Sequence, residues 1–184
     1  MPPASSSDIT ALVASDPWRM RVLAAVRDLD LPDCWVGAGF VRNLVWDELH
    51  GYAERTPLTD VDVVYFDPSD VREEAEATIA ARLHEQLPDV PWEVVNQARA
   101  HRFHGHAPYR STTEALSHWV ETATCIGARL GQDGRVEITA PYGVADLVTG
   151  TLRPVPDRDI FTFNERISKK GWLKRWPKLT VAAD

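Results

Sequence analysis

Residues 36–67 read VGAGFVRNLVWDELHGYAERTPLTDVDVVYFD, and two features of this stretch decide the fold. Gly37 and Gly39 separate a short apolar run from a helix-like run, and Asp60 and Asp62 open a second apolar run. Aspartate is among the poorer strand residues. Two carboxylates on one strand face repel each other unless a cation lies between them. The pair is therefore either solvated at a strand edge or holds a metal ion.

The run that follows the aspartates predicts a buried strand. Side chains alternate along a strand, so Asp60 and Asp62 point to one face while Val61 and Val63 point to the other. Carboxylates about 6 to 7 Å apart on one strand can share a hard cation such as Mg²⁺. Mg²⁺ keeps waters and takes phosphate oxygens as further ligands, which suits chemistry on a nucleoside triphosphate. An Asp-x-Asp pair also arises by chance, so a solvated strand start is the alternative.

The glycines upstream favour a phosphate-binding turn. Gly37 and Gly39 close a strand and open a helix, and glycine there permits a tight turn and close approach of a ligand. The first amides of that helix carry partial positive charge. Arg42 in the first turn adds a forked donor. An ordinary strand-to-helix turn has the same sequence and is the alternative.

Glu93 is a third carboxylate, within the apolar segment PWEVV at residues 91–95. An acidic residue between Trp92 and Val94 in a strand needs a partner or solvent. If this strand lies beside the Asp60 strand, Glu93 faces the two aspartates, and the three acids can hold two metals. One metal would clamp a triphosphate and the other would lower the pKa of an attacking hydroxyl. A surface glutamate at a strand end is the alternative.

Hydrophobic periodicity and turn residues predict the other elements. The expected helices span residues 17–29, 40–49, 113–119, 143–148 and 165–176. The expected strands span 34–36, 61–66 and 91–97, and a β-hairpin covers 124–139. Asp70 is expected to cap a further helix, with Glu73 completing a capping box, and residues 1–7 are expected to be a loose terminus. The alternation of helix and strand predicts a sheet with helices packed on it.

The length of 184 residues suits one domain with an appendage. We expect a core at residues 1–110 and a C-terminal extension at 111–184, packed on the core as one compact unit. The oligomeric state cannot be deduced from the sequence.

The net charge of −7 disfavours a polyanionic partner such as RNA or DNA. The charge is uneven, because residues 166–178 contain six basic residues and no acidic one. This segment either contacts a phosphate or folds back on the acidic body, and Trp172, Leu173 and Trp176 favour folding back.

Cys34 and Cys125 both lie in apolar surroundings, which predicts small core residues of a reducing compartment, not a disulfide. No segment has the length and hydropathy of a signal peptide or a membrane span. We therefore expect a cytoplasmic protein without a membrane partner.

Three segments together resemble the DNA polymerase β-like nucleotidyltransferase superfamily. They are G-x-G-x-V-R-N at 37–43, DVDVVYFD at 60–67 and WEVVNQAR at 92–99. The superfamily pattern is a small glycine turn, an Asp-h-Asp strand, where h is hydrophobic, and a third acid on a later strand. The first segment is also similar to the G-G-x-V-R-D of tRNA nucleotidyltransferases and poly(A) polymerases.

Other segments are similar to a bacterial branch of nucleotidyltransferase family proteins, so the resemblance covers nearly all of the chain. These segments are residues 37–47, 96–101, 119–124 (with Val120 inserted) and 141–147.

The resemblance implies an α+β fold, namely a polymerase β-like core with a small C-terminal α/β extension. It implies that Asp60, Asp62 and Glu93 are catalytic and hold Mg²⁺ (or Mn²⁺). It implies nucleotide binding by the residues at the glycine turn: Gly37, Gly39, Arg42 and Asn43.

The chain departs from the tRNA enzymes in three ways. The turn is Gly-Ala-Gly, Asn43 stands where those enzymes carry Asp, and the loop at residues 50–59 is longer. No tRNA-binding domain is expected, and the acidic balance disfavours a polynucleotide acceptor.

Weaker candidates lie downstream of Glu93. Asn96, Gln97 and Arg99 either contact substrate or satisfy backbone groups at the strand end. His101 belongs to a His-x-x-His-x-His run that either lies near an acceptor pocket or binds zinc, although no cysteine is near. Asp146 either lines the site or is a helix-surface residue.

Two functions follow from these residues. The first is a metal-dependent nucleotidyltransferase that moves a nucleoside monophosphate from an NTP to a hydroxyl of a small molecule or protein. The second is a non-catalytic nucleotide-binding or regulatory module of the same fold. A sugar-nucleotide glycosyltransferase with Mn²⁺ also uses Asp-x-Asp, but the order of elements does not suit it.

Overall fold

A five-stranded mixed sheet is the centre of the protein, which is described over residues 2–182 by a computed structural model. The strands lie in the order β3-β2-β1-β4-β5. Their bounds are β1 Trp35–Gly37, β2 Val61–Tyr65, β3 Trp92–Asn96, β4 Gly127–Leu130 and β5 Val136–Thr139. A second, two-stranded sheet pairs β6 (Thr151–Leu152) with β7 (Thr180–Val181).

The pairing of the strands sets the positions of the carboxylates. β1 is antiparallel to both β2 and β4, and β4 is antiparallel to β5. β2 and β3 are parallel, and Asp62 lies directly beside Glu93 in their register. A parallel pair requires a crossover connection, which α4 (Glu73–Gln86) supplies. The prediction that the Glu93 strand lies beside the Asp60 strand is confirmed.

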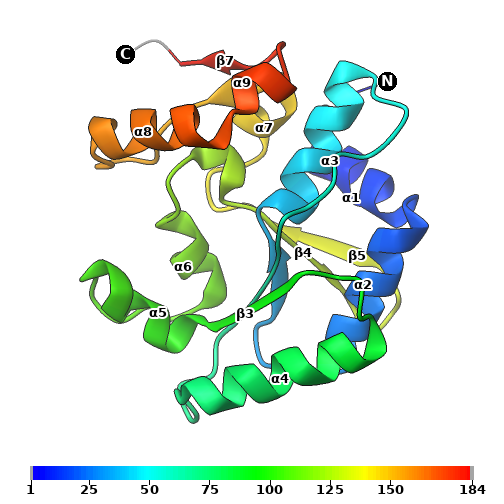
Figure 1. The fold of residues 1–184 in the computed structure, drawn as a ribbon, viewed down its shortest axis with the longest axis vertical. Helices are drawn as coiled ribbons and strands as arrows, with labels where there is room; N and C mark the ends of the chain where they lie inside the picture. The colour runs from blue at the N-terminus through cyan, green and yellow to red at the C-terminus, as the bar shows by residue number, and fades with distance from the viewer. Residues whose placement is uncertain (1, 183–184) are drawn as a thin grey trace.

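Helices cover both faces of the sheet, and Figure 1 shows α8 and α9 together at one end of the molecule and α4 at the other. The remaining bounds are α1 Ser6–Ala14, α2 Pro17–Arg27, α3 Gly39–His50, α5 Gln97–His104, α6 Thr112–Ser117, α7 Ala145–Thr149, α8 Ile160–Lys170 and α9 Trp172–Arg175. In Figure 1, α1 and α2 lie on the opposite side of the strands from α5 and α6.

The alternation of side chains along β2 divides the two faces by chemistry. Val61 and Val63 point into the main apolar core, as expected. Val64 has the parity of Asp62 and packs against Trp35 and Leu116 on the other face. One face of the sheet is therefore sealed by hydrophobic packing, while the other begins with carboxylates and continues beneath α6.

The expected loose terminus at residues 1–7 is corrected at its end, because Ser6 and Ser7 begin α1; residues 2–5 precede the helix, and Met1 lies outside the described residues. Ser5 caps α1 by accepting a hydrogen bond from the Asp8 amide. Ile9 and Val13 are fully buried in the main core, and this burial anchors a helix that is otherwise short. Polar composition alone predicted disorder because the two apolar anchors lie beyond residue 7.

The predicted cap at Asp70 is wrong. The Asp70 carboxylate pairs with the guanidinium of Arg72 at 2.6 Å, and α4 begins at Glu73 after an N-cap, Arg72, that makes no side-chain capping bond. The acidic first turn of α4, which includes Glu74, still favours this helix start electrostatically.

The basic C-terminal segment folds back on the body, as predicted. The Trp172 and Trp176 rings both meet Trp46 edge-on, at centroid distances of 5.4 and 5.1 Å. Trp176 Nε1 also donates to the buried Asp47 carboxylate at 2.8 Å. The predicted single helix at 165–176 is instead two helices, because Gly171 adopts a positive φ between α8 and α9.

Residues 111–184 contribute to the main sheet as well as to the C-terminal cover. The expected hairpin is present as β4 and β5, and β4 pairs directly with β1. The division into core and extension near residue 110 stays a prediction.

Cys34 and Cys125 are free thiols, one half-buried and one buried. Within residues 2–182, no helix has both the length and the apolar character needed to cross a membrane.

Candidate active site

A cavity of about 660 Å³ opens on the carboxylate face of the sheet. Asp60, Asp62 and Glu93 line it from the sheet, and Ala38, Gly39 and Arg42 line it from the start of α3. Residues of α5, α6 and α8 complete its wall. The structure therefore brings the three predicted carboxylates and two of the four predicted glycine-turn residues, Gly39 and Arg42, to one cavity, while Gly37 and Asn43 do not line it.

The three carboxylates interact electrostatically across the two parallel strands. Burial, and after it the charges of Asp60 and Glu93, raise the pKa of Asp62 from its ordinary 3.8 to about 7. Glu93 itself is exposed, and Asp60 is half-buried with Oδ2 accepting from Thr59 Oγ1 at 3.2 Å. The repulsion at Asp62 is what a nearby divalent cation would relieve.

The donor set fits a hard cation, because three carboxylates supply the oxygen ligands that Mg²⁺ prefers. The carboxylate groups themselves stand apart, however. Across residues 2–182, no group of three or more His, Cys, Asp or Glu side chains is arranged closely enough to hold a metal ion. Like charges without a counterion keep apart, so the carboxylates share the cavity without forming a finished coordination shell.

The turn between β1 and α3 depends on a strained alanine. Ala38 has φ 42° and ψ −114°, a conformation that suits glycine. Its amide donates to the Ile126 carbonyl at 3.0 Å, which ties the turn to β4. Gly37 is needed for a different reason, because a Cβ there would lie 2.7 Å from the Trp119 ring. The conformation of the turn thus depends on Ala38, the middle residue of Gly-Ala-Gly. Its close packing depends on Gly37, the first residue.

Replacing Ala38 with glycine is expected to stabilise the fold by about 1 kcal/mol. Relief of one strained backbone position contributes about 1–3 kcal/mol. The greater freedom of glycine in the unfolded chain offsets about 0.4–1 kcal/mol of that gain. Urea unfolding followed by circular dichroism measures the difference. The matched control is Ala77→Gly in the exposed face of α4, which should lower stability by about 1 kcal/mol; equal losses in both variants would contradict the assignment of strain.

Arg42 is the cation at the start of α3. Its Nη2 and Nε donate to Asn43 Oδ1 at 2.9 and 3.2 Å, and its guanidinium carbon lies 4.5 Å from the Trp172 ring centroid. Burial lowers the pKa of Arg42 to about 10, although the charges of Glu121, Asp62 and Asp60 oppose this, so Arg42 stays charged at neutral pH. Asn43 is buried and does not line the cavity. The Asn43 side chain accepts these two hydrogen bonds and so orients Arg42.

Two of the weaker candidates form a structural network behind β3. Asn96 is fully buried, its side-chain amide donates to the Asp67 and Asp70 carbonyls, and its Oδ1 caps α5. Arg99 forms ion pairs with Glu76 and Glu73. Neither lines the cavity. The contacts of Asn96 and Arg99 therefore agree with the structural role at the strand end and not with substrate binding.

Gln97 does line the cavity, although its Nε2 donates to the Val95 carbonyl at 3.1 Å. His101 lies behind the wall, with its ring 6.0 Å from that of Tyr109. Asp146 accepts hydrogen bonds from Thr122 and Arg153 and lies away from the cavity.

Replacing Arg99 with glutamine is expected to lower stability by about 3 kcal/mol without changing the KM for NTP. Removing one partner of a buried ion pair leaves Glu76 with an uncompensated charge. Glu76 also accepts a hydrogen bond from the backbone amide of Asn96 at 2.6 Å. Urea unfolding and steady-state kinetics at saturating metal separate the two effects. A KM that rises several-fold while stability is unchanged would return Arg99 to the substrate-binding residues.

His104, from the histidine run that was expected near an acceptor pocket, lines the cavity together with His118. Burial lowers both imidazole pKa values, and the charges of His106 and then Arg158 lower them further. The structure also adds cavity residues that the sequence patterns missed. Arg166 and Lys170 line the cavity from α8. The sequence predicted a helix at residues 165–176 and the basic character of residues 166–178, but it did not indicate which cations would face the cavity.

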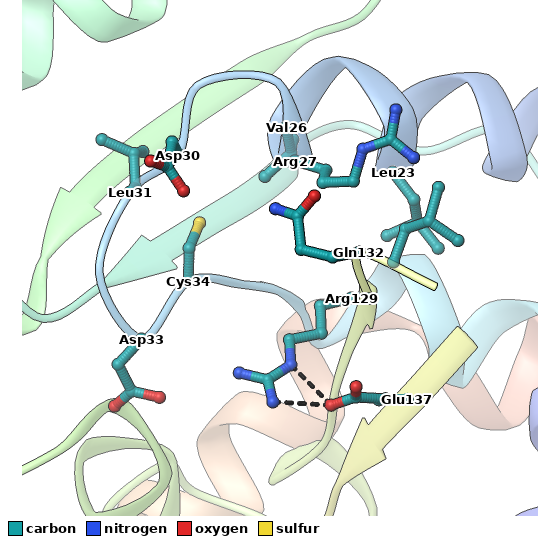
Figure 2. Close-up of a pocket in the computed structure, with 12 residues that line it drawn as sticks. Leu23, Val26, Arg27, Asp30, Leu31, Asp33, Cys34, Arg129, Gln132 and Glu137 are labelled. Atoms are coloured by element: carbon teal, nitrogen blue, oxygen red, sulfur yellow. Dashed lines mark hydrogen bonds and ion pairs between the residues drawn. The ribbon is translucent and has the colours of Figure 1, made fainter. Parts of the chain in front are cut away.

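A second cavity, of about 270 Å³, lies elsewhere and differs in chemistry. Figure 2 shows Cys34 facing it, together with an ion pair between Arg129 and Glu137. Burial raises the pKa of the Cys34 thiol to about 12, so the thiol is protonated and a poor nucleophile at neutral pH. Of the carboxylates that line this cavity, Asp33 accepts from Trp35 and Thr112 and Glu137 pairs with Arg129, so this cavity is the weaker candidate for the reactive site.

Comparison with known proteins identifies the family of this chain and agrees with its fold. A family model described as Nucleotidyltransferase matches residues 24–181. The chain belongs to the nucleotidyltransferase family. A protein solved by NMR and described as a CCA-adding enzyme head domain is 31% identical, with a TM-score of 0.86, and the match covers 99% of this chain and 98% of that one. The predicted superfamily and the predicted α+β, polymerase β-like fold are confirmed.

Larger enzymes share the fold at lower identity. A Thermotoga maritima CCA-adding enzyme complexed with tRNA superposes with a TM-score of 0.58 and 17% identity, over 97% of this nucleotidyltransferase and 42% of the enzyme. A CCA-adding enzyme in complex with CTP gives 0.58 and 16%, over 97% and 43%. No curated protein matches the sequence. The chain thus spans less than half of these larger enzymes.

Proposed function

We propose that this protein transfers a nucleoside monophosphate from an NTP to a hydroxyl group of a small-molecule or protein acceptor, in a reaction that depends on Mg²⁺ or Mn²⁺ and releases pyrophosphate. Membership of the nucleotidyltransferase family supports nucleotidyl transfer in general. The metal, the acceptor and the roles of single residues are our proposal.

The observation that carries the proposal is the convergence of Asp60, Asp62 and Glu93 on one cavity. The carboxylates come from two neighbouring parallel strands, and Asp62 lies directly beside Glu93 in the register. The charges of Asp60 and Glu93 reach Asp62 strongly enough to affect its pKa. A fold that needed these strands only for stability would gain nothing from three like charges at one cavity.

Each group has a role in this reaction. Asp60, Asp62 and Glu93 would hold the divalent metal, which when bound polarises phosphate oxygens and lowers the pKa of the attacking hydroxyl. The first amides of α3, at Gly39 and Phe40, have no partner within the helix and carry partial positive charge suited to phosphate. Arg42 supplies charged donors beside them, held by Asn43. In-line displacement at the α-phosphate then needs no covalent enzyme intermediate.

The acceptor is proposed to be a small molecule or a protein. The net charge of −7 disfavours a large polyanionic surface. The related larger enzymes include one solved with tRNA, so tRNA belongs among the acceptors to be tested. Because this chain spans 42% of that enzyme, its acceptor does not follow from the likeness.

A second candidate is a nucleotide-binding or regulatory module without catalysis. One observation favours it, namely that the carboxylates of residues 2–182 do not form a finished metal shell. The two candidates share the nucleotide site and differ only in whether the phosphoanhydride bond breaks.

The test is incubation of the purified protein with each α-labelled NTP, Mg²⁺ and a cell extract, with or without added tRNA. We expect pyrophosphate release and a labelled product, identified by mass spectrometry. Calorimetric NTP binding without any pyrophosphate release would contradict catalysis and support the regulatory module. A product formed only when tRNA is added would contradict the proposed acceptor class.

A further inference from the structure

The helix α8 forms one wall of the active-site cavity and presents a repeating set of polar side chains to it. Thr162, Arg166 and Lys170 lie four residues apart on one helix face, and Arg158 precedes the helix at the same interval. Four residues make about one turn, so these side chains project along one line. The helix is amphipathic, since Phe163 and Ile167 on another face are buried in the main core.

Glu121 holds Arg166 in position through an ion pair. The Arg166 Nε lies 2.8 Å from Oε1 of Glu121, a fully buried carboxylate whose Oε2 accepts from Thr124 Oγ1 at 3.0 Å. Its guanidinium carbon also lies 5.6 Å from the Trp172 ring centroid. The guanidinium is thus preorganised while a third of the side chain remains exposed to the cavity.

Lys170 is the free cation of this wall. It lines the cavity from α8, on the same wall as Arg166. Yet within residues 2–182 it forms no ion pair with any carboxylate. A lysine placed only to neutralise Asp62 would close on it, and this one instead stays exposed.

Arg42 meets this wall from the other side. The charge of Arg166 is close enough to Arg42 to lower the Arg42 pKa, and both guanidinium groups lie near the Trp172 ring. Two like charges near one aromatic ring repel each other unless an anion lies between them. Glu121, which pairs with Arg166, offsets part of this repulsion.

We propose that Arg166 and Lys170, together with Arg42, bind the β- and γ-phosphates of the NTP and the pyrophosphate that leaves. This rests on the proposed function, because it assigns the leaving-group end of the same site. The carboxylates would hold the metal at the α-phosphate, and the α8 cations would take the rest of the polyphosphate beside the first turn of α3. The C-terminal segment thus completes the nucleotide site.

The other basic residues of the segment do not share this position. Lys169 pairs with Glu165 at 2.7 Å, and Lys174 and Arg175 are exposed outside the cavity. A general polyanion-binding tail would use all of these cations alike. Only the residues on the cavity side should matter for a triphosphate.

The experiment measures binding of inorganic tripolyphosphate to the whole protein without metal, by calorimetry at several salt concentrations. Arg166→Gln and Lys170→Gln are each expected to raise the Kd about tenfold, the loss of one charge-assisted contact. Each should also flatten the dependence of log Kd on log salt, because a cation that contacts phosphate is gone. The control variants Lys169→Gln and Lys174→Gln should change the Kd less than twofold.

Two further variants guard against a purely structural effect. Lys170→Arg keeps the charge and should bind as the wild type does, whereas a merely disturbed helix would not be rescued. Urea unfolding of Arg166→Gln reports whether loss of the Glu121 contact unfolds α8. A folded Arg166→Gln protein and a Lys170→Gln protein that both bind tripolyphosphate normally would overturn the proposal, as would equal losses in the Lys169 and Lys174 controls.

The outcome is independent of catalysis. If tripolyphosphate binding depends on Arg166 and Lys170 but no NTP is turned over, the phosphate site stands and the proposed transfer fails. If NTP is turned over but binding is indifferent to both residues, the transfer stands and this assignment fails.

Discussion

Asp62→Asn is expected to lower metal-dependent NTP turnover by about a thousandfold or more. Asp62 is the central carboxylate, beside Glu93 in the register and two residues from Asp60. Loss of its charge removes a metal ligand whose effect on the reacting phosphate is worth several kcal/mol. Each 1.36 kcal/mol of barrier is a factor of ten in rate. Pyrophosphate release at saturating NTP and Mg²⁺ measures the loss.

The same substitution should leave the protein at least as stable. The folded-state pKa of Asp62 is raised from 3.8 to about 7, so its ionised form destabilises the fold, and this cost grows as pH rises between those values. Asparagine carries no charge, so urea unfolding at pH 8 should show no loss of stability. Lost activity in a folded protein is then chemical in origin.

Asp67→Asn is the matched control for this prediction. Asp67 lies at the turn after β2, accepts from the Ser69 amide at 2.8 Å and does not line the cavity. Activity should stay within about twofold of the wild type, since the substitution leaves every group at the cavity in place. Full activity in Asp62→Asn, or an equal loss in both variants, would contradict the metal assignment.

Trp176→Ala is expected to lower the free energy of unfolding by about 3–5 kcal/mol, the usual cost of truncating a buried aromatic residue. Trp176 is fully buried, meets Trp46 edge-on and donates to Asp47. Asp47 also accepts from the Thr56 amide and hydroxyl, so the same carboxylate ties the C-terminal segment to the loop that leads to Asp60. Urea unfolding followed by circular dichroism gives the value.

Leu173→Ala, three residues earlier, is the control for Trp176→Ala. Leu173 is 42% exposed, so its truncation should cost less than about 0.5 kcal/mol. Similar losses in the two variants would mean that the C-terminal segment is not anchored through Trp176.

The sequence predicted the reactive face of the sheet because that face depends on local rules. Alternation along a strand placed Asp60 and Asp62 together and sent Val61 to the core. Their convergence with Glu93 required one further condition, that β2 and β3 be neighbours, and the structure meets it. Each step involved residues close in sequence or elements joined directly.

The cavity wall formed by α8 could not be predicted in this way. Arg166 reaches the site because Glu121 holds it and because Trp172 packs on Trp46, across more than a hundred residues. Such contacts are set by tertiary packing and leave no periodic signal in a single sequence. The basic composition of residues 166–178 predicted that the segment would dock, but not which cations would face inward.

Two errors have the opposite origin, since strong local signals were overruled. The polar start of the chain suggested disorder, yet Ile9 and Val13 anchor a helix on the core. Asp70 had the sequence of a helix cap, yet Arg72 captured its carboxylate. At the start of the chain, burial in the core overrode the local composition, whereas at Asp70 a neighbouring side chain took the carboxylate that would have capped the helix, a preference of about 1 kcal/mol.

Ala38 shows how the site departs from the glycine pair of the tRNA enzymes. The backbone still requires a positive φ, and this chain meets that requirement with a strained alanine. Asn43 likewise replaces an aspartate and accepts both Arg42 donors without a second negative charge. Asn43 therefore holds the Arg42 guanidinium without offsetting its charge, which leaves that charge available to a phosphate.

The most direct test of the account is a crystal structure of the protein with Mn²⁺ and a non-hydrolysable NTP analogue, with the metal located by its anomalous scattering. The account predicts anomalous peaks within coordination distance of Asp60, Asp62 and Glu93, with the α-phosphate beside them. An analogue bound in the cavity without metal at these carboxylates, or metal bound only elsewhere, would contradict it.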